Sequence, residues 1–275
     1  MSSPSRATDW PSNRPRSART RHRYASAFGA RRATFLVPAV LVLLMRSPVA
    51  LALAFAPTEA EWYHWPDYCQ ARYTVSGAGT DSQFANRVDP ATVKSWEAKL
   101  GPDVWYALHH YCAGMIIATR AKAEPDKKER LALFNRAIDE DQFTLQRMPQ
   151  AHPMRAEIAA RMGLLYAEIG QPDLALQHFD IAIDGCPSCG VGYEAKSMYL
   201  KSHGQLEAAR DVLVAGDKAV DGSSAQIHYF LGLVLLELKD FDAASEQARK
   251  AYGQGYPLPG LRDLLAKAGH PLASP

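Results

Sequence analysis

The sequence lacks the motifs that mark most enzymes and nucleic-acid-binding proteins. It contains no glycine-rich loop of the kind that cradles a nucleotide, and no Ser/His/Asp arrangement in a recognisable setting. Once residues 1–56 are set aside, 22 basic and 28 acidic residues remain, which is a net charge of −6 without a basic stripe. We therefore expect no enzymatic activity, no cofactor, no small-molecule substrate and no nucleic acid partner.

The histidines lack the spacing of a metal site. His109 and His110 precede Cys112 by a few residues, but adjacent histidines project in different directions from a helix, and no second ligand pair lies at i, i+4. The other histidines considered are scattered along the chain: His152, His178, His203 and His228. We predict no metal site, and we expect His109 to occupy the place that a small residue usually takes where two helices cross.

Acidic residues are almost missing from the first 56 positions, which hold nine Arg and only Asp9. Residues 1–33 are expected to form a disordered basic tail, and residues 34–56 a signal peptide or a membrane anchor. The apolar run ends in small residues near Ala56, which favours cleavage there and export to the periplasm or the medium.

The apolar run is not continuous, because Arg46 and Pro48 interrupt it. A membrane-spanning helix needs about 20 consecutive apolar residues, so an uncleaved anchor is the weaker interpretation. Membrane contact is expected only through this segment, if it is retained. The richness in Arg and Ser leaves an organelle transit peptide as a third possibility.

Cysteine is scarce, with four in 275 residues. In an oxidising compartment such cysteines form cross-links. Cys69 lies in an aromatic segment, residues 57–102, for which we expect one short helix. Cys112 shares a helical face with Trp105 and Leu108, so it points inward and is the favoured partner of Cys69. Four cysteines allow three pairings, and the sequence alone does not choose among them.

The other two cysteines form the one motif that could carry chemistry, Cys186-Pro187-Ser188-Cys189. In thiol oxidoreductases the first Cys of such a pair sits at a helix amino terminus, where the helix dipole lowers its pKa. Here a helix is expected from about Val191, but no strand precedes the pair. We favour a local disulfide that pins a turn. Thiol–disulfide activity of Cys186 and Cys189 is the alternative function.

The most informative pattern is a repeat of 34 to 35 residues. Three sets of positions recur at that spacing: Gly163, Ser197 and Gly232; Ala175, Ala209 and Ala244; Phe179, Leu213 and Ala248. Small residues let two antiparallel helices approach closely, and the larger ones fill the space beside the crossing. A period of this length is typical of stacked helix pairs, which bind other chains more often than they catalyse reactions.

These residues resemble the tetratricopeptide repeat (TPR) family, and the chain is similar to exported bacterial proteins that contain such repeats. The resemblance implies an all-α fold, a right-handed superhelical array of antiparallel helix pairs. Three clear repeats are expected at residues 156–189, 190–224 and 225–257. A divergent helix pair is expected at 103–155, with a charged insertion from Lys122 to Arg130, and a capping helix and tail at 258–275.

The resemblance also implies a concave groove lined by the first helix of each repeat. The groove positions that it assigns are Glu157, Ala160, Leu164, Glu168, Glu194, Met198, Lys201, Tyr229, Leu233 and Leu236. Family members that clamp a terminal carboxylate carry Lys and Asn there. This chain instead has Ala160, Glu194 and Tyr229 at the Lys positions, so such a clamp is not expected. A groove of this composition suits the apolar face of a protein or peptide partner. The expected function is a non-enzymatic interaction scaffold.

Overall fold

A computed structural model of the protein describes residues 56–272, and the regular secondary structure of this part of the chain is entirely helical. The predicted basic tail, and the predicted signal peptide or anchor apart from Ala56, lie outside the described residues. Between residues 56 and 272, no helix combines the length with the apolar character needed to cross a membrane. The helices are α1 (Glu59–His64), α2 (Asp67–Thr74), α3 (Gly77–Thr80), α4 (Pro90–Leu100), α5 (Pro102–Ala123), α6 (Lys127–Arg147), α7 (Met154–Glu168), α8 (Pro172–Gly185), η2 (Pro187–Cys189, a 3₁₀ turn), α9 (Val191–Ser202), α10 (Leu206–Ala219), α11 (Ala225–Glu237), α12 (Phe241–Gly253) and α13 (Gly260–Lys267).

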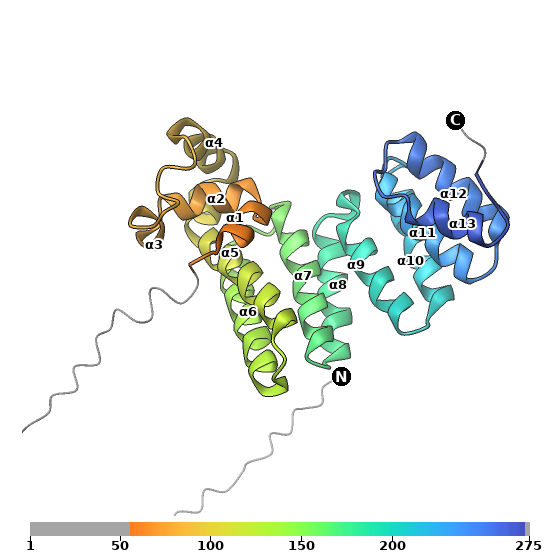
Figure 1. The fold of residues 1–275 in the computed structure, drawn as a ribbon, viewed down its shortest axis with the longest axis horizontal. Helices are drawn as coiled ribbons and strands as arrows, with labels where there is room; N and C mark the ends of the chain where they lie inside the picture. Colours follow the sequence, from red (N-terminus) through yellow and green to blue (C-terminus); the bar gives the residue numbers. More distant parts are fainter. Residues whose placement is uncertain (1–55, 273–275) are drawn as a thin grey trace, which may run out of the picture. The chain divides into compact units, whose positions relative to one another are not determined.

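Consecutive helices pack as hairpins, which is the arrangement that the repeat predicts. Helix α7 packs on α8, α9 on α10 and α11 on α12, and each pair turns through only a few residues (Figure 1). The turns contain a residue in the left-handed region at the same repeat position, with φ of 74° at Gly170, 72° at Gly204 and 64° at Lys239. Glycine adopts this conformation without strain, whereas Lys239 does so at a cost of about 1 kcal/mol. The fold class, a TPR-like solenoid, is confirmed.

The periodic residues are buried, because they form the contact within each hairpin. A Cβ atom on Gly163 would stand 2.5 Å from the Phe179 ring and 3.0 Å from the carbonyl oxygen of Ala175. No larger residue fits that crossing without displacing α8. All nine periodic positions are buried.

Neighbouring hairpins also approach closely. A Cβ on Gly192 of α9 would lie 2.6 Å from the backbone nitrogen of Ile183 on α8, so the second hairpin rests directly on the first. At the far end, Leu261 of α13 packs against Gly232 of α11, and Leu261 and Leu265 are fully buried. Helix α13 therefore covers the last hairpin, as the predicted capping helix should.

The divergent pair, α5 and α6, differs from the prediction in one respect. The charged stretch from Lys122 to Arg130 is not an insertion: it comprises the end of α5, a three-residue connection and the start of α6. The extra sequence lengthens the helices, which have 22 and 21 residues, compared with 15 and 14 in α7 and α8. The small residue at their crossing is Gly114, whose Cβ would meet Asp141 at 2.7 Å. His109 does not fill that place; it is half-buried beside Arg72.

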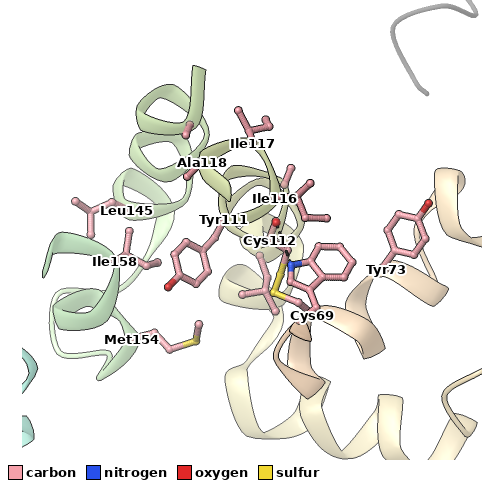
Figure 2. Close-up of a cluster of buried hydrophobic side chains, with 14 of the residues drawn as sticks. Cys69, Tyr73, Tyr111, Cys112, Ile116, Ile117, Ala118, Leu145, Met154 and Ile158 are labelled. Carbon is pink, nitrogen blue, oxygen red and sulfur yellow. Dashed lines mark hydrogen bonds between the residues drawn. A yellow bond between two sulfur atoms is a disulfide. The ribbon is translucent and has the colours of Figure 1, made fainter. Parts of the chain in front are cut away.

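Residues 57–102 form four helices where one short helix was expected. Their core is aromatic: Trp62 stacks on Phe84 with centroids 4.4 Å apart and meets Tyr73 edge-on. A disulfide joins Cys69 of α2 to Cys112 of α5, with Cα atoms 5.5 Å apart, and both residues are buried (Figure 2). The cross-link ties this aromatic segment to the divergent helix pair.

Candidate interaction groove

The first helices of consecutive hairpins lie against one another, so α7, α9 and α11 share one face. Two hollows follow the contact between α7 and α9, with volumes of about 290 Å³ and 410 Å³. Leu164 and Met198 line both hollows, and they are 40% and 45% exposed. Two large apolar side chains exposed side by side in a hollow are a feature that a partner would cover. We call this surface the α7/α9 groove.

The smaller hollow contains two glutamates. Glu157 comes from α7 and Glu194 from α9, and both carboxylates line it together with Ala160 and Val191. Glu157 Oε1 accepts hydrogen bonds from the hydroxyl groups of Tyr68, at 2.9 Å, and Tyr111, at 2.8 Å. Burial and the nearby Glu157 carboxylate raise the pKa of both phenols, so they remain protonated donors. Glu157 is thereby fixed from two directions.

Glu194 has a weaker polar environment. Its Oε1 is 3.5 Å from Ser224 Oγ, at the amino terminus of α11, and Tyr256 lies close to it. Burial raises the pKa of Glu194 to about 7, because partial removal from water disfavours the carboxylate, and the Ser224 hydroxyl only partly opposes the shift. No Lys or Arg forms an ion pair with Glu194 among residues 56–272.

The raised pKa of Glu194 predicts a specific pH dependence of stability. A carboxyl group whose pKa is higher in the folded state binds more protons there, so its contribution to stability falls as pH rises from about 4.5 to about 7. We expect Glu194→Gln to remove this loss and to stabilise the protein at pH 8 by about 1 to 2 kcal/mol, allowing for solvent screening. Urea unfolding at pH 5 and pH 8 measures the effect. A variant no more stable than wild type at pH 8 would contradict it.

Arg161 also lines the smaller hollow, but its charge is already engaged. Its Nη1 donates to Asp141 of α6, which is fully buried, whereas its buried Nη2 has no hydrogen-bond partner among residues 56–272. The guanidinium lies over the Tyr111 ring, 5.3 Å from the centroid. Burial raises the pKa of Asp141, whereas Arg161 lowers it. This ion pair joins the divergent hairpin to the first repeat.

The larger hollow is more mixed in charge. Lys122 from the end of α5 lines it, together with Glu168 of α7 and His203, which follows α9. The α7/α9 groove therefore has an acidic hollow at one end and a hollow with both signs of charge at the other, with Leu164 and Met198 between them.

The family resemblance assigns ten residues to the groove, and only some of them line these hollows. Ala160, Leu164, Glu168, Glu194 and Met198 do, together with Glu157. The remaining four are engaged elsewhere or half-buried: Lys201, Tyr229, Leu233 and Leu236. Lys201 forms an ion pair with Glu237, and Tyr229 is buried against the Tyr256 ring, 4.2 Å away between centroids.

Several groove residues are absent from the sequence-based prediction. Tyr111 and Lys122 come from α5, which belongs to the divergent pair and not to the three clear repeats. Arg161 precedes Leu164 by about one helical turn, so the helix period alone could have predicted that it lines the groove. Gln226 lies at the start of α11. The residues from α5 could not be placed, because the register of the divergent pair depends on its longer helices.

Both cysteine pairs are oxidised. Besides Cys69–Cys112, a disulfide joins Cys186 to Cys189 across η2, with Cα atoms 5.3 Å apart. Cys189 is exposed and lies two residues before the first residue of α9. Two disulfides indicate an oxidising compartment. No group of three or more His, Cys, Asp or Glu side chains suited to a metal ion occurs within residues 56–272.

The hairpins and their shared face define the class: a TPR-like helical protein, a fold that is typically non-enzymatic and that engages protein partners. No protein-family model matches the chain, and no curated protein matches it. Among solved structures, the chain is similar to the TPR-containing protein described as "MamA RS-1 ArsTM double mutant". The identity is 17%, over 69% of this chain and 96% of that chain, with a TM-score of 0.41. The helix packing in residues 56–272, and not this likeness, defines the fold.

Proposed function

We propose that this protein is a non-enzymatic scaffold of the TPR family that binds a segment of a protein partner along the α7/α9 groove, in an exported, oxidising compartment. The observation that carries the proposal is the exposed pair Leu164 and Met198 in a hollowed surface between two first helices. Interfaces draw most of their affinity from a few apolar or aromatic anchors that become buried in such hollows.

The export part of the proposal is supported by the two disulfides, which persist only where thiols are not kept reduced. The apolar run before Ala56 supplies a route for export, with cleavage near Ala56. A retained anchor at the membrane and an organelle target are the alternatives. Amino-terminal sequencing of the protein isolated from its source distinguishes all three.

The binding proposal is tested by charging the groove. We expect Leu164→Glu combined with Met198→Glu to abolish recovery of the partner that the wild-type protein retains from native extract, because two carboxylates cannot be buried beneath an apolar segment. Both side chains are exposed in the free protein, so the helical circular dichroism should be unchanged.

The matched control is Val214→Glu. Val214 is a comparably exposed apolar residue, 52% accessible, on the second helix of the second repeat. The Val214→Glu variant should recover the partner as well as the wild type does. Equal recovery by the double variant and the wild type would exclude the α7/α9 groove as the binding surface. Loss of helical signal in the double variant would instead show that Leu164 and Met198 belong to the core.

A thiol–disulfide function of Cys186 and Cys189 has weaker support. Exchange needs an attacking thiol that the protein keeps activated at a helix amino terminus. Cys186, the first thiol of the pair, is instead the C-cap of α8, and its disulfide to Cys189 spans the turn η2 between two repeats.

A further inference from the structure

We propose that the smaller hollow of the α7/α9 groove receives an arginine side chain of the partner, and that an adjacent apolar residue of the partner lies on Leu164 and Met198. This inference rests on the proposed function and specifies the chemistry of the partner. It is carried by three features of the hollow: its charge, its apolar walls and its volume.

The lining of the hollow is acidic, and its cation is already engaged by another acid. Glu157 and Glu194 face it from two different helices. Arg161, the one cation that the described part of the chain contributes to the lining, already donates to Asp141 and lies over the Tyr111 ring. Glu157 receives its two hydrogen bonds at Oε1 from neutral phenols, which hold the carboxylate in place without cancelling its charge. A cationic guest is the complement of this arrangement.

The walls of the hollow are apolar. Ala160 and Leu164 from α7, and Val191, Ala195 and Met198 from α9, line it beside the two carboxylates. A long basic side chain buries its methylene stem along such a wall while its charged end reaches the acids. The volume of about 290 Å³ is at the lower limit of small-molecule pockets, so it suits one side chain and not a large ligand.

Arginine suits this site better than lysine. Its guanidinium has donors on more than one edge, so it can reach carboxylates that project from two helices, and it is less strongly hydrated than an ammonium group. Its hydrogen bonds to carboxylates are charge-assisted and directional. A lysine would present a compact charge that holds its water more firmly.

The environment of Glu194 supports a cationic partner. The side chain is partly withdrawn from water and forms no ion pair with a Lys or Arg of residues 56–272. Burial therefore raises its pKa, and the folded protein is less stable at a pH above the ordinary pKa of a carboxyl group. A guanidinium beside it would restore the favourable surroundings of the ionised form. The net charge of −6 on the part of the chain after residue 56 favours the approach of a basic partner as well.

Three capped tripeptides test the proposal with the full-length protein: acetyl-Leu-Arg-Leu-amide, its lysine analogue and its citrulline analogue. Citrulline keeps the shape of arginine but carries no charge. Binding is measured by calorimetric titration. We expect the arginine peptide to bind, the citrulline peptide to bind about tenfold more weakly or worse, and the lysine peptide to fall between them.

Matched variants assign the binding to the hollow. Glu157→Gln and Glu194→Gln should each weaken the arginine peptide by about tenfold and leave the citrulline peptide unchanged, because a neutral amide keeps the shape of the site. Glu207→Gln, an exposed acid on α10, should change neither. Equal binding of the arginine and citrulline peptides, no binding of any peptide at millimolar concentration, or arginine binding that ignores both groove variants would each overturn the proposal.

The two proposals fail in different ways. If Leu164→Glu with Met198→Glu abolishes partner recovery but the arginine peptide does not bind, the groove remains an interaction surface and the arginine assignment is wrong. If the full-length protein self-associates on sedimentation, and Glu157→Gln and Glu194→Gln abolish that association, the groove is occupied by a second copy of the chain and the assignment to a separate partner is overturned.

Discussion

Replacing Phe179 with alanine is expected to lower the free energy of unfolding by about 3 to 5 kcal/mol. Phe179 is fully buried, and its ring lies directly over Gly163 at the crossing of α7 and α8. The same ring packs against Tyr199 of α9, with centroids 5.6 Å apart. Its removal leaves a cavity at the contact of three helices. The glycine on one side has no side chain that could fill it, so the loss should fall in the upper part of that range.

Chemical denaturation followed by helical circular dichroism measures this loss. Val214→Ala is the control, because it removes apolar atoms from an exposed position on α10 and should change stability by less than about 0.5 kcal/mol. A loss below about 1 kcal/mol for Phe179→Ala would show that α7 and α8 collapse onto the vacancy. The hairpin would then be less rigid than its close contacts indicate.

The repeat period predicted the three hairpins well because it records a physical requirement. Two helices approach within contact distance only where one of them carries a small residue, so glycine, serine and alanine recur at the crossing. The same register extends to the turns: Gly170 and Gly204 are followed, after a further 35 residues, by Lys239 with a positive φ. The position in the repeat, and not the residue type alone, therefore marks where the turn takes the left-handed conformation.

The prediction was less complete where contacts cross long stretches of chain. Tyr68 and Tyr111 hold Glu157 from 89 and 46 residues away, and no local pattern indicates either bond. The four helices of residues 57–102 are short and are organised around Trp62 and its aromatic neighbours. Short helices take their stability from packing and not from intrinsic propensity, so their number could not be predicted from the sequence.

The candidate site, too, was predictable only in part. Leu164 and Met198 follow from the helix register, because each occupies the same place on the first helix of its repeat, and both are exposed in the groove. Leu233 holds the corresponding place in the third repeat but is half-buried, and Tyr229, about one turn earlier, is covered by Tyr256, which follows α12. A residue outside the repeat helices thus covers one of the groove positions, which the helix register alone does not predict.

Removing the Cys69–Cys112 disulfide is expected to cost about 4 kcal/mol. The two residues are 43 positions apart, and a cross-link over that distance strongly restricts the unfolded chain. In the folded protein the bond joins α2 to α5, and Trp65 Nε1 donates to the carbonyl oxygen of Cys112 at 3.2 Å. The variant Cys69→Ala with Cys112→Ala tests this in chemical unfolding.

The second disulfide supplies a control within the same molecule. Cys186 and Cys189 are separated by only 3 positions, so the same loop argument assigns their bond about 1.5 kcal/mol. The loss for Cys69→Ala with Cys112→Ala should therefore exceed the loss for Cys186→Ala with Cys189→Ala by about 2 to 3 kcal/mol. Equal losses would mean that loop length does not set the effect. The packing of Trp62 and Trp65 would then hold the aromatic segment on α5. The disulfide would form at a contact that is stable without it.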